Sequence, residues 1–377
     1  MILFRARRYL CKDCKKTQLQ ENPFGFEGQN VSYALLRIVL QRLGDLNYTL
    51  KMISEELNIS PTQINTYLDS FITLPPVRLP ESLGIDEIHD PQLSYKGSAY
   101  LCVLVDNEER CLCDVLGSRR KDHLDNYFRR FSREEREKVR YVTIDMWEPY
   151  KDLAERHFPN ALVAVDPFHV VKHLCAAFSK LRVSLMKQCI YDSNGYYLLK
   201  RWHWLLEKDD VFLDNEPLYN HRFQRKMNRR EIKEMILKNF PLLSVAYYLK
   251  ESYRSFNASA AYEGAKERLE ELIREFESAD IPQYREFTSL LKHWRREILN
   301  SFLRPYEDRK LSNAFCENIN GKLRTYLTLS RGIANFDRFR KRALFALDPH
   351  TFYSLTSVLS NGKHEGRKRG SYRKPQE

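Results

Sequence analysis

The sequence predicts an α/β protein: a mixed five-stranded sheet with flanking helices, interrupted by a large α-helical insertion and preceded by an N-terminal helical region. Between residues 83 and 169, three strand-like segments in a row are followed by alternating helix and strand patterns. From about 168 to 300 the pattern is overwhelmingly helical. Three strand-like segments also carry or end on an aspartate, namely Asp86, Asp145 and Asp166. A carboxylate beside an apolar core is costly unless a cation or donors satisfy it, so these aspartates indicate a site.

Composition favours a polyanionic partner. The chain has 377 residues and a formal net charge of +12, which is typical of many nucleic-acid-binding proteins. No run of about 18 uncharged apolar residues predicts a transmembrane helix, and the N-terminus lacks a secretory signal, so we expect a cytoplasmic protein without a membrane partner. The eight cysteines are scattered, which favours reduced thiols over a disulfide framework.

Residues 1–24 form a partial zinc-ribbon-like segment. Cys11 and Cys14 make one CxxC flanked by basic residues, which supplies two of the four ligands that a structural zinc needs. The segment is either half of a zinc ribbon whose other half would lie upstream of Met1, or a basic knuckle without metal. We favour the second interpretation and expect no zinc at Cys11 and Cys14.

Residues 25–72 predict a helix-turn-helix region. A first helix covers 31–43, and two short helices follow within 49–71, the second capped by Ser60 with Pro61 at its first position. In a helix-turn-helix, this second helix would offer four polar side chains to a DNA groove: Thr62, Gln63, Asn65 and Thr66. A plain helical hairpin is the alternative. Residues 73–82 contain three prolines and predict a linker.

The predicted catalytic core comprises residues 83–175 and 305–350. Strands at 83–88, 99–106 and 110–117 form a meander, followed by a helix at about 121–131, a strand ending at Asp145, a helix near Glu148, and a strand ending at Asp166. This is the element order of a ribonuclease-H-like fold, with helices on both faces of the sheet.

The helical insertion covers residues 176–304. Five of its basic residues either track phosphates or form a solvated face: Arg222, Arg225, Lys226, Arg229 and Arg230. After it, residues 311–326 place Asn313, Glu317 and either Asn320 or Gly321 on one helix face, with Lys322 and Arg324 one turn on as candidate DNA contacts. Residues 361–377 form a basic tail that we expect to be disordered. No phosphate-binding glycine motif indicates ATP use.

Two aspartates and one glutamate at the end of a sheet can hold two Mg²⁺ or Mn²⁺ ions about 4 Å apart. Carboxylates are suitable ligands because hard cations prefer oxygen. In this hypothesis Asp86 bridges both ions, while Asp145 and Glu317 each hold one. Glu87 lies on the opposite strand face, and one of the two acidic neighbours must point outward; we expect Asp86 to point into the site.

The strings IDEIHD, YVTIDMWEPYKDLAERHFPNALVAVDPFHVVKHL and SNAFCENINGKLRTYLTLSRGIANFDRFRKRAL resemble the ISL3 family of bacterial insertion-sequence transposases, over almost the whole chain. The resemblance implies a DDE transposase with a ribonuclease-H-like core and a helical insertion before the glutamate. It implies binding of terminal inverted repeats, metal-dependent cleavage, joining of 3′-hydroxyl ends to target DNA, and a homodimer in the DNA complex. Carried over by position, the catalytic and metal-binding triad is Asp86, Asp145 and Glu317.

Accessory residues follow from a second resemblance. Asp166 and His169 resemble the Asp-x-x-His signature of Mutator-type transposases, in which His169 would contact the scissile phosphate or orient a ligand carboxylate. The alternative is that Asp166 caps the following helix and His169 packs. Trp147 either stacks on a base or packs, and packing is favoured.

Family members usually begin with a complete zinc-binding segment, whereas this chain begins midway through one, so a truncated reading frame is expected. The runner-up function is therefore a truncated or domesticated DNA-binding protein without transposition activity. A third is a nuclease of the Holliday-junction resolvase type. The intact triad argues against the second function, and the family-type ends of the chain argue against the third.

Overall fold

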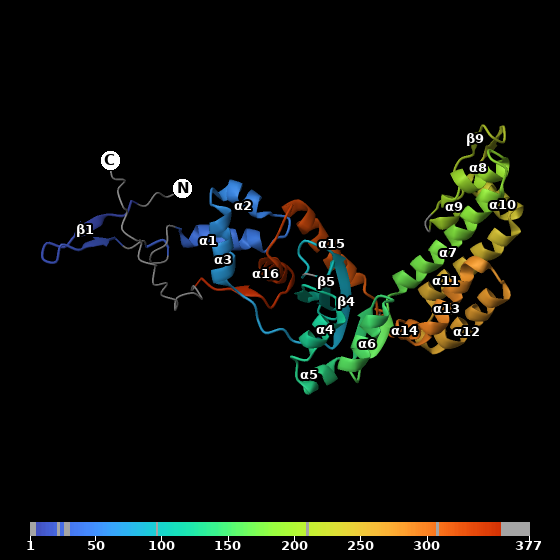
Figure 1. Cartoon of the computed structure of the whole chain (residues 1–377). Helices are drawn as coiled ribbons and strands as arrows, with labels where there is room; N and C mark the ends of the chain where they lie inside the picture. The colour runs from blue at the N-terminus through green and yellow to red at the C-terminus, as the bar shows by residue number, and fades with distance from the viewer. Residues whose placement is uncertain are drawn as a thin grey trace, which may run out of the picture.

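The computed structural model describes residues 5–20, 23–25, 31–95, 97–208, 211–306 and 309–355. It is elongated, with N-terminal helices at one end, a five-stranded sheet in the middle and the helical insertion at the other end (Figure 1). The predicted basic tail, 361–377, lies outside the described residues. No described helix is both long and apolar enough to cross a membrane.

The first described segment is an exposed hairpin of β1 (Arg8–Leu10) and β2 (Thr17–Leu19). Cys11 and Cys14 lie in its turn, where the Cys11 N–H donates to the Lys16 carbonyl at 2.9 Å. The turn presents both thiols to solvent.

Three helices follow, as predicted: α1 (Tyr33–Leu43), α2 (Leu50–Leu57) and α3 (Pro61–Phe71). The N-cap residues are Ser32, Thr49 and Ser60, in that order. The side-chain hydroxyl of each accepts a hydrogen bond from a backbone N–H of the first turn, which satisfies a donor that has no partner within the helix. Asn58 (φ 54°) adopts the left-handed conformation that ends α2. Asparagine tolerates this conformation better than most residues, which permits the tight turn into α3.

The central sheet has the order β6-β5-β4-β7-β8. Strands β4 (Ser82–His89), β5 (Tyr100–Asp106) and β6 (Cys111–Leu116) form the antiparallel meander, and β7 (Tyr141–Ile144) and β8 (Leu162–Val165) extend it in parallel from β4. The mixed five-stranded sheet predicted from the sequence is therefore confirmed.

Helices cover both faces, because alternate side chains of a strand point to opposite sides. On β5, Leu101 and Val103 pack with the cluster of α15 (Ala314–Ser330) and α16 (Phe336–Leu347), whereas Leu104 packs with that of α4 (Lys121–Phe128) and α6 (Glu148–His157). The helix predicted at 121–131 was too long. It ends at Phe128, and a separate helix α5 (Arg133–Lys138) begins at a capping box.

The insertion begins with α7 (Pro167–Gln188), which runs without a break across residue 176. The sequence predicted an overwhelmingly helical insertion, but the insertion also contains a hairpin formed by β9 (Leu218–Asn220) and β10 (Arg225–Met227). The helices after α7 are α8 (Asn194–Arg201), α9 (Trp204–Glu207), α10 (Arg229–Asn239), α11 (Pro241–Ser259), α12 (Tyr262–Ser278), η1 (Pro282–Tyr284), α13 (Arg285–His293) and α14 (Arg295–Asn300).

Helix α14 returns the chain to the sheet. The Asn300 side-chain amide donates to the Val163 carbonyl of β8 at 2.7 Å, and Lys151 pairs with the buried Glu297 at 2.9 Å. These contacts cover the edge strand β8, which would otherwise expose unpaired backbone groups. Within the insertion, three of the basic residues noted above form ion pairs: Arg222 with Asp192, Arg225 with Glu231 and Arg230 with Asp214.

The predicted linker at 73–82 suggested a loose connection, but the N-terminal helices are attached closely to the core. Strand β3 (Ile72–Thr73) pairs with β11 (Phe352–Tyr353), which follows α16. Arg342 of α16 is 1% exposed and donates to the carbonyls of Leu43 and Asp45, both at 3.3 Å, and to that of Tyr48. A buried guanidinium therefore joins the loop after α1 to the core.

Candidate active site

The carboxylates gather at the edge where β7 and β8 end. Both strands are parallel and stop one residue before Asp145 and Asp166, so these side chains meet. His169, in the first turn of α7, places its Nε2 3.1 Å from the Asp145 Oδ1 and 3.8 Å from the Glu317 Oε1. One ligand atom from each of Asp145, Asp166 and His169 lies within 4.8 Å of the others.

Asp86 lies on the central strand β4 and is 4% exposed. The Asn320 side-chain amide donates to its Oδ2 at 2.6 Å, and the Glu87 N–H donates to its Oδ1 at 2.7 Å. Burial and the charge of Asp145 raise the pKa of the Asp86 carboxyl from 3.8 to about 7. The charge of Glu317 raises it further, so the three triad candidates act on one another electrostatically.

The other two aspartates are also difficult to ionise. Burial and the charge of Asp166 raise the pKa of the Asp145 carboxyl to about 7, and burial raises the pKa of Asp166 above its ordinary value. Several carboxylates that repel one another in a buried place are typical of a site that a cation completes.

The donors present fit a hard divalent cation. Asp145 Oδ1 and His169 Nε2 are buried, and neither has a hydrogen-bond partner in the described part of the chain, although they lie at ion-pair distance. Because buried polar atoms are normally satisfied, each unsatisfied atom requires an explanation, and a missing ion is one. The carboxylate oxygens of the aspartates suit Mg²⁺ or Mn²⁺.

A buried polar network positions Glu317. Asn313 is the N-cap residue of α15, one turn before Glu317. Its side-chain amide donates to the Ile85 carbonyl at 2.9 Å and its Oδ1 accepts from the Thr143 hydroxyl at 2.8 Å, tying α15 to β4 and β7. Sequence analysis placed Asn313 on the right helix face but missed its role and missed Thr143, since two residues 170 positions apart give no local signal.

Gly84 allows α15 to approach this closely. A Cβ atom there would lie 2.6 Å from a methyl carbon of Val105 and 3.1 Å from the Asn313 Oδ1. Glycine avoids both contacts, and the network therefore depends on the absence of a side chain at position 84.

Asp166 occupies the N-cap position of α7. Burial has the larger effect and raises the pKa of its carboxyl, while the backbone N–H groups of Phe168 and Asn313 act to lower that pKa. Its side chain also lies with Asp145 and His169, so the helix-cap and accessory interpretations both stay predictions.

The sequence predicted that one of the neighbours Asp86 and Glu87 would point outward, but Glu87 does not point to solvent. It is half-buried on the other face of β4, paired with Arg119 and accepting from the Tyr150 hydroxyl at 3.3 Å. The Arg119 guanidinium lies 4.6 Å from the centre of the Trp147 ring, and Trp147 packs edge-on against Tyr150. Trp147 also lines a cavity of about 490 Å³.

The candidate DNA contacts lie in two places. On α3, Thr62 and Thr66 are exposed, while Gln63 and Asn65 are half-buried. The Gln63 amide donates to the Tyr67 hydroxyl at 2.6 Å, which occupies one of its donors.

Lys322 and Arg324 are exposed on α15. Arg324 extends toward the carboxylates, with its Nη1 3.9 Å from the Glu317 Oε2. The structure thus brings Arg324 to the carboxylate cluster, whereas α3 lies with the N-terminal helices beside α16 (Figure 1).

Comparison with known proteins gives consistent matches. A family model for DDE transposases of the ISL3 type, described as "Transposase", matches residues 83–343. The transposase for insertion sequence element IS1001 of Bordetella parapertussis is 22% identical over 335 residues, covering 88% of this chain and 78% of that protein. The transposase for IS1557 of Mycobacterium tuberculosis is 24% identical over 283 residues, covering 71% and 60%.

Proposed function

This chain belongs to the ISL3 family of insertion-sequence DDE transposases, and on that basis we propose that it cleaves DNA at the terminal inverted repeats of its element and joins the resulting 3′-hydroxyl ends to target DNA. The meeting of Asp86, Asp145 and Glu317, from three distant segments, carries the proposal. The mixed sheet is then the ribonuclease-H-like core, and the helices between α7 and α14 are the insertion before the glutamate.

In this proposal Asp86, Asp145 and Glu317 would hold two Mg²⁺ or Mn²⁺ ions. Such a pair, when bound, activates a water or a 3′-hydroxyl and offsets the charge that develops on phosphorus. The protein contributes orientation: Asn320 and the Glu87 N–H hold the Asp86 carboxylate, and the Asn313 network holds the turn that carries Glu317.

Asp166 and His169 have an accessory role. His169 Nε2 lies near both Asp145 and Glu317, so it can orient either carboxylate or contact the scissile phosphate. Arg324 would bind a phosphate of the DNA end, a contact that would replace its pairing with Glu317 at 3.9 Å.

DNA recognition is assigned to α3 as the second helix of a helix-turn-helix, with Thr62, Gln63, Asn65 and Thr66 facing the groove. Lys322 and Arg324 contact the backbone near the cleavage site. Because two element ends must be held together, we expect a homodimer in the DNA complex.

The test is strand transfer of a pre-cleaved inverted-repeat end into plasmid DNA with Mg²⁺. Asp86→Asn, Asp145→Asn and Glu317→Gln are expected to lower product at least about a hundredfold, because each removes a metal ligand. Asp152→Asn, on the exposed face of α6, is the matched control and is expected to retain activity.

Equal product from wild type and Asp145→Asn would remove Asp145 from the mechanism. DNA binding without any Mg²⁺-dependent product would favour the DNA-binding protein without transposition activity. Cleavage of four-way junctions regardless of the repeat sequence would favour the resolvase-type nuclease.

A further inference from the structure

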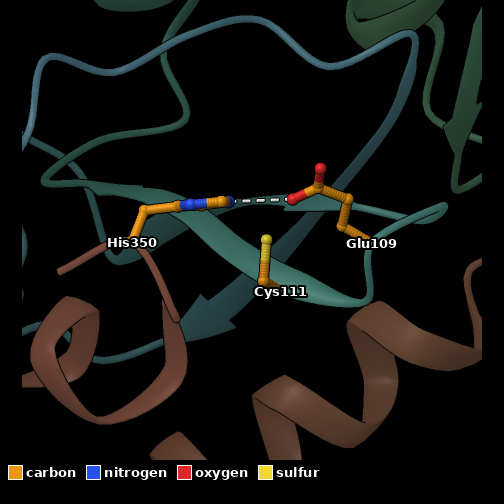
Figure 2. Close-up of side chains that lie close together, drawn as sticks. All are labelled: Glu109, Cys111 and His350. Carbon is orange, nitrogen blue, oxygen red and sulfur yellow. Dashed lines mark hydrogen bonds and ion pairs between the residues drawn. The ribbon is translucent and has the colours of Figure 1, made fainter.

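A second cluster of metal-ligating side chains lies at the opposite edge of the sheet, where the β5–β6 turn meets the loop after α16. The ligand atoms of Glu109, Cys111 and His350 all lie within 4.8 Å of one another, and His350 Nε2 is 2.8 Å from the Glu109 Oε2. Figure 2 shows the Cys111 thiol pointing toward the space between the other two side chains. Because β5 runs antiparallel to β4, this edge is the one away from Asp145.

Backbone turns fix both sides of the cluster. On one side, Asp106 Oδ1 accepts from the Glu108 and Glu109 N–H groups at 2.8 and 3.0 Å. On the other, the Asp348 carboxylate accepts from the His350 N–H at 2.9 Å and from the Thr351 hydroxyl at 2.8 Å. The donors are therefore brought together by the fold and not by the flexibility of long side chains.

Cys113 lies outside the group of three whose ligand atoms are within 4.8 Å of one another, but it is the neighbouring thiol that would supply a fourth donor. It follows Cys111 by two residues on β6, at the register shift opposite Leu104 and Val105. Both cysteines line one cavity of about 520 Å³ together with Glu109, His350 and residues 74–81. Two thiols, an imidazole and a carboxylate therefore share one cavity.

We propose that Glu109, Cys111, Cys113 and His350 bind a single zinc-class cation. Thiolate, imidazole and carboxylate are the ligands of tetrahedral Zn²⁺, at bond lengths of about 2.0 to 2.3 Å. Those lengths place neighbouring donors about 3.5 Å apart, so the His350–Glu109 pair opens by less than an ångström. Binding releases the protons of the two thiols to solvent, and the two sulfur donors discriminate against Mg²⁺.

The position of this site indicates a structural role. Residues 74–81 connect β3 to β4, and the His350 loop leads directly into β11, which pairs with β3. A cation at this place would link the sheet, the connecting segment and the loop that leads back to the N-terminal helices. It would thus hold the N-terminal helices in a defined orientation relative to the core, independently of the chemistry at Asp145.

The test is Co²⁺ binding to the reduced, metal-free full-length chain carrying Cys11→Ser and Cys14→Ser, which removes the competing thiols of the β1–β2 turn. We expect one equivalent of Co²⁺ with sulfur-to-cobalt charge-transfer absorption and tetrahedral visible bands, displaced by Zn²⁺ but not by excess Mg²⁺. Binding at the Asp145 cluster would give no sulfur band, since its ligands are oxygen and nitrogen.

Two variants locate the site. In the same background, Cys111→Ser is expected to reduce the sulfur band sharply, and His350→Gln to weaken Co²⁺ binding on the order of 100-fold or more, beyond the effect of losing an outer-shell partner. His293→Gln is the matched control. It removes the exposed pair of His293 and Glu148, whose Nε2 and Oε2 atoms are 3.0 Å apart, and this pair belongs to no group of metal-ligating side chains among the described residues.

Absence of a cysteine-dependent band in the background protein would overturn the proposal. So would unchanged affinity in His350→Gln, whose side chain is largely exposed and whose loss should leave the fold intact, as circular dichroism would verify. If Cys111→Ser does not fold, His350→Gln and Cys113→Ser decide the outcome.

Discussion

Neutralising Asp145 is predicted to stabilise the metal-free protein at about pH 8 and to abolish its stabilisation by Mg²⁺. The reason is that Asp145 is held among other carboxylates, so its ionised form is penalised in the folded state. The asparagine of Asp145→Asn carries no charge and removes the mutual repulsion with Asp166 and Asp86.

The magnitude follows from the pKa. The Asp145 carboxyl titrates at about 7 in the folded protein and at about 3.9 in the unfolded chain. Between these values the unfolded state loses its proton first, so the free energy of unfolding falls as the pH rises from about 4 to about 7. Three pKa units correspond to about 4 kcal/mol, which is the upper limit, and we expect a gain of about 1 to 4 kcal/mol for Asp145→Asn at pH 8.

Urea unfolding of wild type and Asp145→Asn would be measured at about pH 5 and pH 8, in chelator and in excess Mg²⁺. The free energies of unfolding of the two proteins, measured in chelator, should differ strongly at pH 8. They should differ less at pH 5, where the Asp145 and Asp86 carboxyls of the folded wild type are largely protonated. Wild type should gain stability from Mg²⁺, about 2.7 kcal/mol at a hundred times the dissociation constant, and the variant should not. The reasoning would be refuted if Asp145→Asn were less stable than wild type at pH 8 in chelator, or if Mg²⁺ stabilised it as much as it stabilises wild type. Asp152→Asn is the control.

Three further substitutions test the supports of the site and the core. Asn320→Ala removes the donor to the Asp86 Oδ2 and should lower strand transfer about 10- to 100-fold, with partial recovery at high Mg²⁺; an unchanged rate would show that Asp86 needs no such partner. Gly84→Ala places a methyl group 2.6 Å from Val105 and should lower the free energy of unfolding by about 1 to 3 kcal/mol, measured by urea unfolding. Arg342→Leu leaves the carbonyls of the loop after α1 without their donor and should cost about 3 kcal/mol, with faster proteolysis at residues 74–81; equal resistance would argue that α3 and α16 pack firmly without it.

Local patterns predicted most elements of the core. The helix start at Ser60 was predicted because a capping hydroxyl acts within three residues of itself. The caps at Ser32 and Thr49 follow the same rule but were not identified from the sequence. The succession of the five strands along the chain was predicted from their apolar and β-branched runs, whereas their order across the sheet came from the structure. The additional helix α5 and the β9–β10 hairpin were missed, since both are short and depend on packing more than on a long periodic pattern.

Of the candidate site, Asp145 and Asp166 could be found from the sequence, because parallel strands that end on aspartate must present them at one edge. Glu317 was found by resemblance, and its distance to His169 is a result of folding. The supports at Asn313 and Thr143 carry no sequence signal, since their partners lie far away along the chain.

The family, the sheet and the residue types able to bind a divalent cation could be predicted without a structure, because these depend on periodicity, strand ends and ordered motifs. That Asp166 lies beside Asp145 and His169, and that Arg342 joins the N-terminal helices to the core, became visible in the folded chain alone. The same holds for the meeting of His350 with Glu109, which lies 241 positions away, and with Cys111. Contacts between distant segments arise from the burial of whole faces of helices and strands, and no short stretch of sequence contains that information.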